Sequence, residues 1–105
     1  MDDTLTDSSY LILLALLKPQ HGYAIMKQVS EMTGERVSIG PASMYTILKK
    51  LQKSGYITLE ENAERKKTYL ISQQGLEVLE KDVQRRKLLY QAGEALLARQ
   101  KEDTQ

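Results

Sequence analysis

The chain has no cysteine, no tryptophan and no phenylalanine, and it has a single histidine. Without cysteine it has no disulfide framework, thiol nucleophile or cysteine-based metal site, and a reducing cytoplasm suits it. The sequence has one histidine, no glycine-rich phosphate loop and no paired carboxylates beyond ordinary surface acids. These residues do not suggest a catalytic centre. We therefore expect a cytoplasmic protein that is not an enzyme and that has no catalytic residues, cofactor or metal site.

Long hydrophobic runs are also missing. The longest, from Tyr10 to Leu17, has eight residues, whereas a helix needs about 20 to span a bilayer. No basic segment precedes this run as it would in a signal peptide. We expect no membrane association and no signal peptide, and the length of 105 residues suits one small domain with a modest core.

Positive charge is scarce overall but unevenly placed. The formal net charge is only +1, yet residues 36–69 hold seven lysines and arginines against three acidic residues. Residues 1–35 show the opposite bias, with two basic residues against five acidic ones. A basic surface for a polyanion must therefore come from the middle third of the chain.

Apolar spacing predicts two helices in the first third. Residues 8–17 are apolar almost all round, with Thr6 or Asp7 as the N-cap and Lys18-Pro19 as the stop, so this helix needs cover on more than one side. Residues 21–34 predict an amphipathic helix that ends at a glycine, followed by a short extended piece over residues 36–40. The inward stripe of the second helix is Ile25, Val29 and Met32.

The stretch GPASMYTILKKLQKSGYI, residues 40–57, predicts a third helix with Pro41 in its first position. The spacing i, i+3, i+4, i+7 gives a buried stripe of Met44, Ile47, Leu48 and Leu51. The opposite face is small, polar and basic: Ala42, Thr46, Lys49 and Lys53, flanked by Ser43, Lys50 and Tyr45.

Period-two alternation then predicts a β-hairpin with its tip at residues 62–66. Its expected inward residues are Ile57, Leu59 and Leu70. A long final helix follows, capped by Ser72. Its main apolar line is Leu76, Leu79, Val83, Tyr90 and Leu97, and a second line is Leu89, Ala92 and Leu96, so it needs two neighbours. We expect only residues 1–5 and 100–105 to fray.

This order of elements is that of a mainly α fold with a small β-hairpin, a winged helix-turn-helix domain followed by a C-terminal helix. In such domains the third helix enters the DNA major groove and the hairpin, or wing, lies on the flanking backbone. Small residues at the start of the third helix let its backbone approach the bases, and its free N–H groups favour a phosphate. Lysines farther along the helix can reach phosphate oxygens.

Three blocks carry a family resemblance: HGYAI at 21–25, GPASMYTILKKLQKSGYI at 40–57 and RKKTYLISQQG at 65–75. Together they resemble the PadR family of bacterial transcriptional regulators, specifically its short subfamily with one C-terminal helix. The likeness runs over about residues 5–97. The wing departs from the family pattern, since Ala63 and Glu64 precede Arg65 where the family commonly has a glycine, and Thr68 replaces a common aromatic.

The resemblance implies a homodimer that binds double-stranded DNA at an inverted-repeat operator and represses transcription until a small molecule of unknown identity intervenes. It divides the chain into a DNA-binding domain, residues 1–72, and a dimerisation helix with a frayed tail, residues 73–105. The implied DNA-binding residues are Pro41, Ala42, Ser43, Tyr45, Thr46, Lys49, Lys50, Arg65, Lys66 and Lys67. The implied dimer interface is Tyr10, Leu13, Leu14, Leu17, Leu79, Val83, Tyr90 and Leu97.

Several alternatives stay open at the level of sequence. The lysines of the third helix could form a solvated face, and Tyr45 could either pack against the hairpin or contact a phosphate. Three acidic residues beside the wing, Glu60, Glu61 and Glu64, leave its contact with DNA undecided. The lone His21 is expected to be a structural hydrogen-bonding residue. A winged helix can also serve as a protein-binding module without DNA binding.

Overall fold

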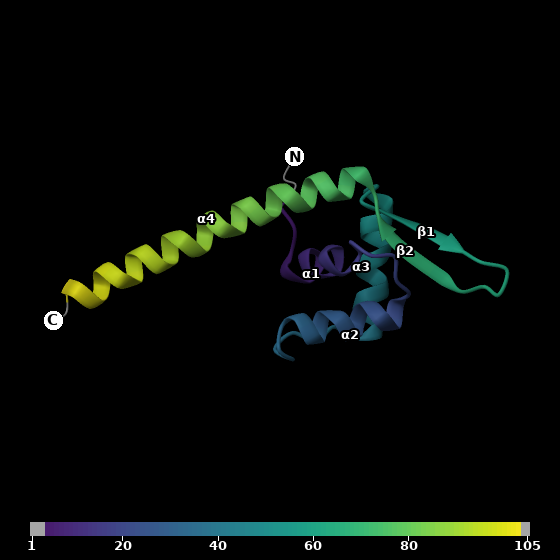
Figure 1. Ribbon diagram of the computed structural model, residues 1–105, viewed down its shortest axis with the longest axis horizontal. Helices are drawn as coiled ribbons and strands as arrows, with labels where there is room; N and C mark the ends of the chain where they lie inside the picture. The colour runs from purple at the N-terminus through teal and green to yellow at the C-terminus, as the bar shows by residue number, and fades with distance from the viewer. Residues whose placement is uncertain (1–3, 104–105) are drawn as a thin grey trace.

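The computed structural model describes residues 4–103. The elements follow in the order α1 (Asp7–Ala15), α2 (Gly22–Met32), α3 (Pro41–Lys53), β1 (Ile57–Glu61), β2 (Lys67–Ile71) and α4 (Gln73–Asp103) (Figure 1). The fold is mainly helical with one two-stranded antiparallel hairpin. The predicted winged helix-turn-helix domain with a long C-terminal helix is confirmed.

Each helix begins at a residue suited to that place. The Thr6 side chain caps α1 by accepting from the Ser9 N–H, and Pro41 starts α3 directly after Gly40. Ser72 caps α4, because its Oγ accepts from the Gly75 N–H at 3.0 Å. Such caps satisfy N–H groups that the helix itself leaves without partners.

Helix α1 lies at the centre of the domain and packs against α2, α3 and α4. Its Ile12 and Leu13 are fully buried, and so is its C-cap Leu16, as the nearly uniform apolar character of this segment predicts. Around them lie the buried stripes of α2 and α3, formed by Ile25, Val29, Met44, Leu48 and Leu51. Ile47 is only half-buried at the edge of this core.

The hairpin register corrects one predicted inward residue. Leu59 pairs with Tyr69 and Ile57 with Ile71, so these four side chains share the face toward the core. Leu70 pairs with Thr58 and therefore lies on the other face. The prediction for Leu70 was wrong by one residue, because the alternation of β2 follows Tyr69 and Ile71.

The extended piece predicted at residues 36–40 forms no strand. Its backbone is bonded locally instead, since the Val37 N–H donates to the Thr33 hydroxyl at 3.1 Å, and that hydroxyl donates to the Val29 carbonyl within α2 at 2.9 Å. A third backbone neighbour for the hairpin comes from Gln20, which forms an antiparallel bridge with Tyr69. The connection between α1 and α2 thus borders the wing.

Two further expectations need correction. Met32 is exposed rather than buried, because α2 ends at this residue and its side chain lies at the edge of the core. Leu5 does not fray: its side chain is buried, and its N–H donates to Asp82. Residues 100–103 continue α4, while the frayed ends predicted at residues 1–3 and 104–105 lie outside the described residues.

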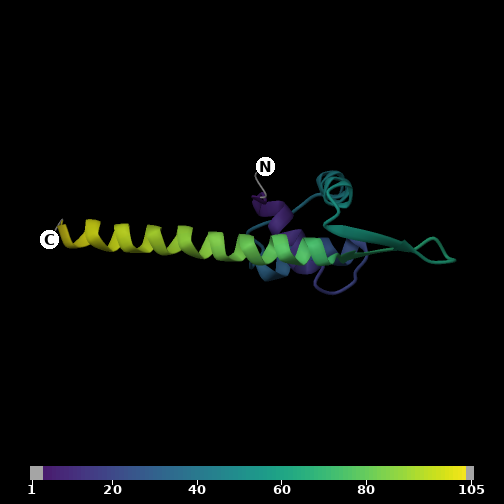
Figure 2. The same ribbon diagram turned by 90° about the horizontal axis from the view of Figure 1, so that it is seen from above.

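Helix α4 has two halves with different surroundings. In the first half Gly75, Val78, Leu79 and Asp82 are buried against the domain. Gly75 is required there, because a Cβ at this position would lie 2.0 Å from the Tyr56 carbonyl oxygen. From residue 83 to residue 103 none of the side chains is buried, and this half projects away from all other elements in both views (Figures 1 and 2).

Candidate nucleic-acid interface

The outward face of α3 is fully exposed, as predicted from its sequence. Ala42, Thr46 and Lys49 lie along it, and Pro41, Ser43, Tyr45, Lys50 and Lys53 are exposed beside it. Gly40 caps the helix without a side-chain hydrogen bond. The exposed residues of the first turn, Pro41, Ala42 and Ser43, are small, so another molecule can approach the backbone N–H groups there closely.

The tip of the wing is held in a defined turn by Asn62. Its Oδ1 accepts from the N–H groups of Glu64 and Lys66, at 3.0 and 2.9 Å. Arg65 adopts a positive φ of 63° at this turn, a conformation that a glycine takes more easily. Because the backbone is fixed in this way, the exposed side chains of Arg65, Lys66 and Lys67 extend from a rigid support.

One acidic neighbour reduces the charge at the wing tip. Glu64 lies 3.7 Å from the Lys66 ammonium group, and both side chains are about three-quarters exposed. An ion pair this exposed is worth little and is easily exchanged for another partner. The basic side chains of the wing therefore remain free to bind a polyanion.

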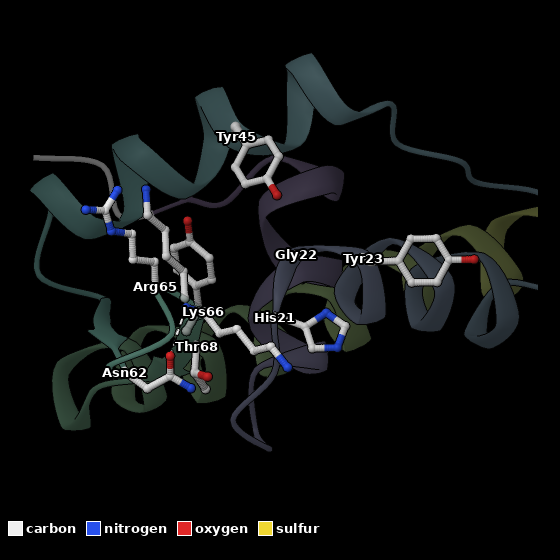
Figure 3. Close-up of a pocket in the computed structure, with 10 residues that line it drawn as sticks. His21, Gly22, Tyr23, Tyr45, Asn62, Arg65, Lys66 and Thr68 are labelled. Carbon is white, nitrogen blue, oxygen red and sulfur yellow. Dashed lines mark hydrogen bonds between the residues drawn. The ribbon is translucent and has the colours of Figure 1, made fainter.

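Between the wing, α3 and the start of α2 lies an open groove of about 570 Å³. Figure 3 shows Tyr45 reaching from α3 toward His21 and Gly22, with Arg65 and Lys66 entering from the wing. The ring of Tyr23 points away from this group. The remaining residues that line the groove are Asn62, Lys67, Thr68 and Tyr69.

The groove brings two phenol groups together. Tyr69 is buried, and this burial raises its pKa, with a smaller rise from the neighbouring Tyr45. Tyr69 therefore stays protonated at neutral pH and keeps an O–H donor. Together with the lysines and arginine of the wing, the groove offers hydrogen-bond donors and positive charge, which is the chemistry that binds a phosphodiester.

Thr46 has its hydroxyl hydrogen engaged within the helix. Its Oγ1 lies 3.0 Å from the Ala42 carbonyl oxygen and donates to it. The lone pairs of the hydroxyl and the methyl group remain on the outward face. This side chain can therefore accept from a base amino group or pack on a thymine methyl group, but it is not arranged to donate.

The residues predicted for a dimer interface separate into three groups by exposure. Leu13 and Leu79 are buried in the core of the chain itself. Tyr10 and Leu14 are half-buried, while the exposed ones are Leu17, Val83, Tyr90 and Leu97. Three further exposed leucines lie on the same half of α4 and were not among the predicted interface residues: Leu88, Leu89 and Leu96.

Sequence reasoning missed the contribution of α2 to the groove. His21 does act as a structural residue, since its Nδ1 accepts from the Ala24 N–H at 3.4 Å and caps α2. The same capping geometry also places it at the groove, next to Gly22. The signal was available in the HGY triplet, where a glycine at a helix start permits close approach of a neighbouring side chain.

The family model described as "Transcriptional regulator PadR-like family" matches residues 11–81. This match covers all of α1 to β2 except the first turn of α1, and it includes the docked start of α4. The chain belongs to the PadR-like family. It is accordingly a member of a family of transcriptional regulators whose DNA-binding fold is a winged helix.

Several solved structures share the fold. A transcriptional regulator from Clostridium thermocellum superposes with a TM-score of 0.73 at 24% identity, over 83% of this chain and 89% of that one. A PadR family regulator from Eggerthella lenta gives 0.72 at 24% identity, over 84% and 75%. The smu.1704 protein of Streptococcus mutans gives 0.68 at 26% identity, over 86% and 85%.

A relative from a mobile element is similar in sequence. An uncharacterized 37.1 kDa protein in transposon TN4556 of Streptomyces fradiae is 32% identical over 77 residues, 72% of this chain. The match spans only 22% of the length of that relative.

The described residues hold neither a metal centre nor a spanning helix. Within residues 4–103, no three or more histidine, aspartate or glutamate side chains gather into a group suited to a metal ion. No helix in this part of the chain combines the length and apolar character that crossing a membrane requires.

Proposed function

We propose that this PadR-like protein is a repressor that binds an inverted-repeat operator as a homodimer and releases it when a small molecule binds. One observation carries the proposal: the outward face of α3 and the wing both expose basic side chains, and a donor-rich groove lies between the two elements. In this arrangement Thr46 faces the bases, while the lysines of α3 and the three basic residues of the wing contact phosphates.

The proposed dimer is supported by the exposed half of α4. At about 100° per residue, Leu88, Leu89, Tyr90, Leu96 and Leu97 cover one side of the helix. This side continues the face on which Val78 and Leu79 are buried against the domain. Large apolar side chains gathered on one face without cover are typical of an interface, and a second copy offers the same helix and Leu17, which follows the end of α1.

A two-fold dimer explains why the operator would be an inverted repeat. It presents two α3 helices related by symmetry, and they must lie about 34–36 Å apart to enter successive major grooves. A bound dimer of this kind occludes the DNA that it covers, which accounts for repression. The effector would bind at the interface, where Tyr10 and Tyr90 are the aromatic residues of α1 and α4, and the protein would act in the cytoplasm.

Selection from a random-sequence DNA library tests the DNA-binding part of the proposal. We expect the recovered sequences to share an inverted repeat with half-site centres about 10–10.5 base pairs apart. A winged-helix module that binds only proteins would enrich no sequence. A single half-site without its inverted copy would contradict the dimeric mode of binding.

Charge substitution on α4 tests the dimer without removing any of the chain. Leu89→Glu combined with Leu96→Glu places two carboxylates on the apolar face, and we expect a monomer in sedimentation experiments. The matched control is Gln91→Glu with Ala98→Glu, which adds the same charge at exposed positions on the opposite face of the same half. Dimers in both variants would mean that another surface holds the subunits together.

A further inference from the structure

Arg86 lies where α4 leaves the domain and holds several parts of the chain together. Its Nε donates to Asp82 at 2.6 Å, its Nη1 to Asp7 at 2.7 Å and its Nη2 to the Leu5 carbonyl oxygen at 3.1 Å. Its guanidinium carbon is 4.1 Å from the centre of the Tyr10 ring. One side chain thus links α4 to α1 and to the segment before it.

Asp82 completes this cluster from inside. It is only 3% exposed, and it also accepts from the Leu5 N–H at 3.4 Å and from Arg85 Nε at 3.0 Å. A carboxylate is costly to bury unless it is paired and hydrogen-bonded. The two arginines and the backbone N–H supply those partners, so the cluster is satisfied: no buried side-chain nitrogen or oxygen atom among the described residues is left without one.

The position of the cluster gives it a mechanical role. Gly75, Val78 and Leu79 anchor the start of α4 by apolar packing, which is not directional and permits small rotations. A guanidinium group has a rigid, planar set of donors, so its hydrogen bonds fix direction as well as distance. Beyond Arg86 every side chain of α4 as far as Asp103 is exposed, so the contacts of Arg86 set the direction of the exposed half.

A small change in this direction has a large effect at the far end of α4. The helix continues for 17 residues beyond Arg86, a length of about 26 Å at 1.5 Å per residue. A tilt of about 10° moves that end by about 4–5 Å, which exceeds the rise of about 3.4 Å for one base pair. In a dimer joined through α4, the same tilt changes the separation of the two α3 helices.

We propose that Arg86 is a positioning residue for DNA recognition: by holding α4 to Asp7 and Leu5, it sets the half-site spacing that the dimer prefers. This rests on the dimeric DNA binding proposed above. Arg86 itself touches no DNA in this scheme. It acts on the angle between the winged-helix domain and the helix that joins the two subunits.

Two conservative substitutions test this role. Arg86→Lys retains the positive charge but loses the planar fork. Asp7→Asn removes the carboxylate charge and so weakens one link, at a side chain that is 86% exposed and with little risk to folding. The matched control is Arg85→Lys, because Arg85 contacts Asp82 within the same helix and does not reach α1. Cooperative thermal unfolding of each variant verifies that it is folded.

Binding is measured on the inverted repeat recovered by selection and on versions with one base pair added to or removed from the centre. We expect the wild type and Arg85→Lys to prefer the selected spacing by at least about tenfold. Arg86→Lys and Asp7→Asn should reduce this preference about threefold or more. If the contacts of Arg86 had only a structural role, Arg86→Lys and Asp7→Asn would lower the affinity for all three DNAs equally. That result would overturn the inference.

A second measurement needs no DNA. The chain has no cysteine, so Gln52→Cys on α3 carries one nitroxide label per subunit, and pulsed electron resonance gives the distance between the labels. We expect a narrow distribution for the wild type and Arg85→Lys, and a broader or shifted one for Arg86→Lys. If Arg86→Lys forms a dimer with the same label distances and the same spacing preference as the wild type, this inference is overturned and the proposed function is not. A wild type without any inter-label distance is not a dimer, which overturns the proposed function as well.

Discussion

Gly22 at the start of α2 lies directly against the ring of Tyr45 from α3. A Cβ atom at Gly22 would be 2.6 Å from the Tyr45 Oη and 3.1 Å from its Cζ, and it would also be 3.0 Å from Met44 Cε. No ordinary contact is this short, so the absence of a side chain at residue 22 allows the phenol to lie in the groove. The conformation of a proposed DNA-contacting residue on α3 therefore depends on a glycine of α2.

We expect Gly22→Ala to weaken DNA binding several-fold with little loss of stability. The Tyr45 ring is 48% exposed and can move away from the new methyl group, but it then leaves the groove. Tyr45→Phe should weaken binding by about 1 kcal/mol if the hydroxyl donates to a phosphate. Titration of both variants with operator DNA checks this. Unchanged affinity of Tyr45→Phe would assign Tyr45 a packing role only.

Thr46 should affect sequence preference rather than overall affinity. Because its hydroxyl hydrogen is donated to Ala42, the side chain presents an acceptor and a methyl group. We expect Thr46→Ala to change the preference at one operator position by ~1 to 3 kcal/mol. Thr46→Val keeps a methyl group and removes the acceptor, so comparing the two variants on single-base operator changes separates the contacts. Equal losses on operator and random DNA would exclude base reading by Thr46.

Replacing Arg65, Lys66 and Lys67 together by glutamine should lower DNA affinity and leave the fold intact. These side chains are exposed at a turn whose backbone is held by Asn62. Glu64→Gln is the opposite test, because it removes the acidic partner of Lys66 and should raise the affinity for DNA. Gel-shift titrations with circular dichroism of each variant provide the test. If the triple variant binds normally, the wing does not reach the DNA.

The Asp82 cluster should make stability depend on pH. Burial alone would raise the pKa of Asp82, but hydrogen bonds from Arg86, Arg85 and the Leu5 N–H outweigh it and hold the pKa below its ordinary value. The stabilisation is therefore complete above the unfolded pKa of about 3.9 and is lost as pH falls through the lower native value. We expect Asp82→Asn to cost about 2 to 4 kcal/mol at neutral pH, since its amide would place a donor against arginine donors.

Urea denaturation of the wild type and Asp82→Asn, at one protein concentration, checks this expectation. The difference in unfolding free energy should be full at pH 7 and should shrink steadily below about pH 4. A difference that stays constant down to pH 2 would mean that the charge of Asp82 contributes nothing.

Apolar spacing was sufficient to find the helices, and start signals such as Pro41 after Gly40 and Ser72 before α4 placed the beginnings of α3 and α4. It failed where long-range contacts decide. Leu70 was misplaced because strand pairing sets the register. Leu13 and Leu79, predicted for an interface, are buried within their own chain, and the sequence alone does not distinguish an apolar residue covered by its own chain from one covered by a second copy.

The charged part of the candidate site was predictable and its shape was not. Local spacing places Lys49 and Thr46 on one face of a helix, and both are exposed there. The groove depends instead on Gly22, His21 and Tyr69, which come together only when α2, α3 and the wing pack. The role of Arg86 has no local signal in the sequence, because its partners Asp7 and Leu5 are 79 and 81 residues away.

The salt dependence of operator binding tests the central claim most directly. DNA binding through several phosphates must weaken steeply as salt rises, and each lost phosphate contact lowers the log–log slope by about 0.9. We predict a steep slope for the wild type and a reduction of about 1.8 per dimer for Lys49→Ala on operator and random DNA alike. Lys87→Ala, on the polar face of α4, should leave the slope unchanged. A wild-type affinity that hardly changes with salt, or equal slopes for all three proteins, would contradict DNA binding through α3.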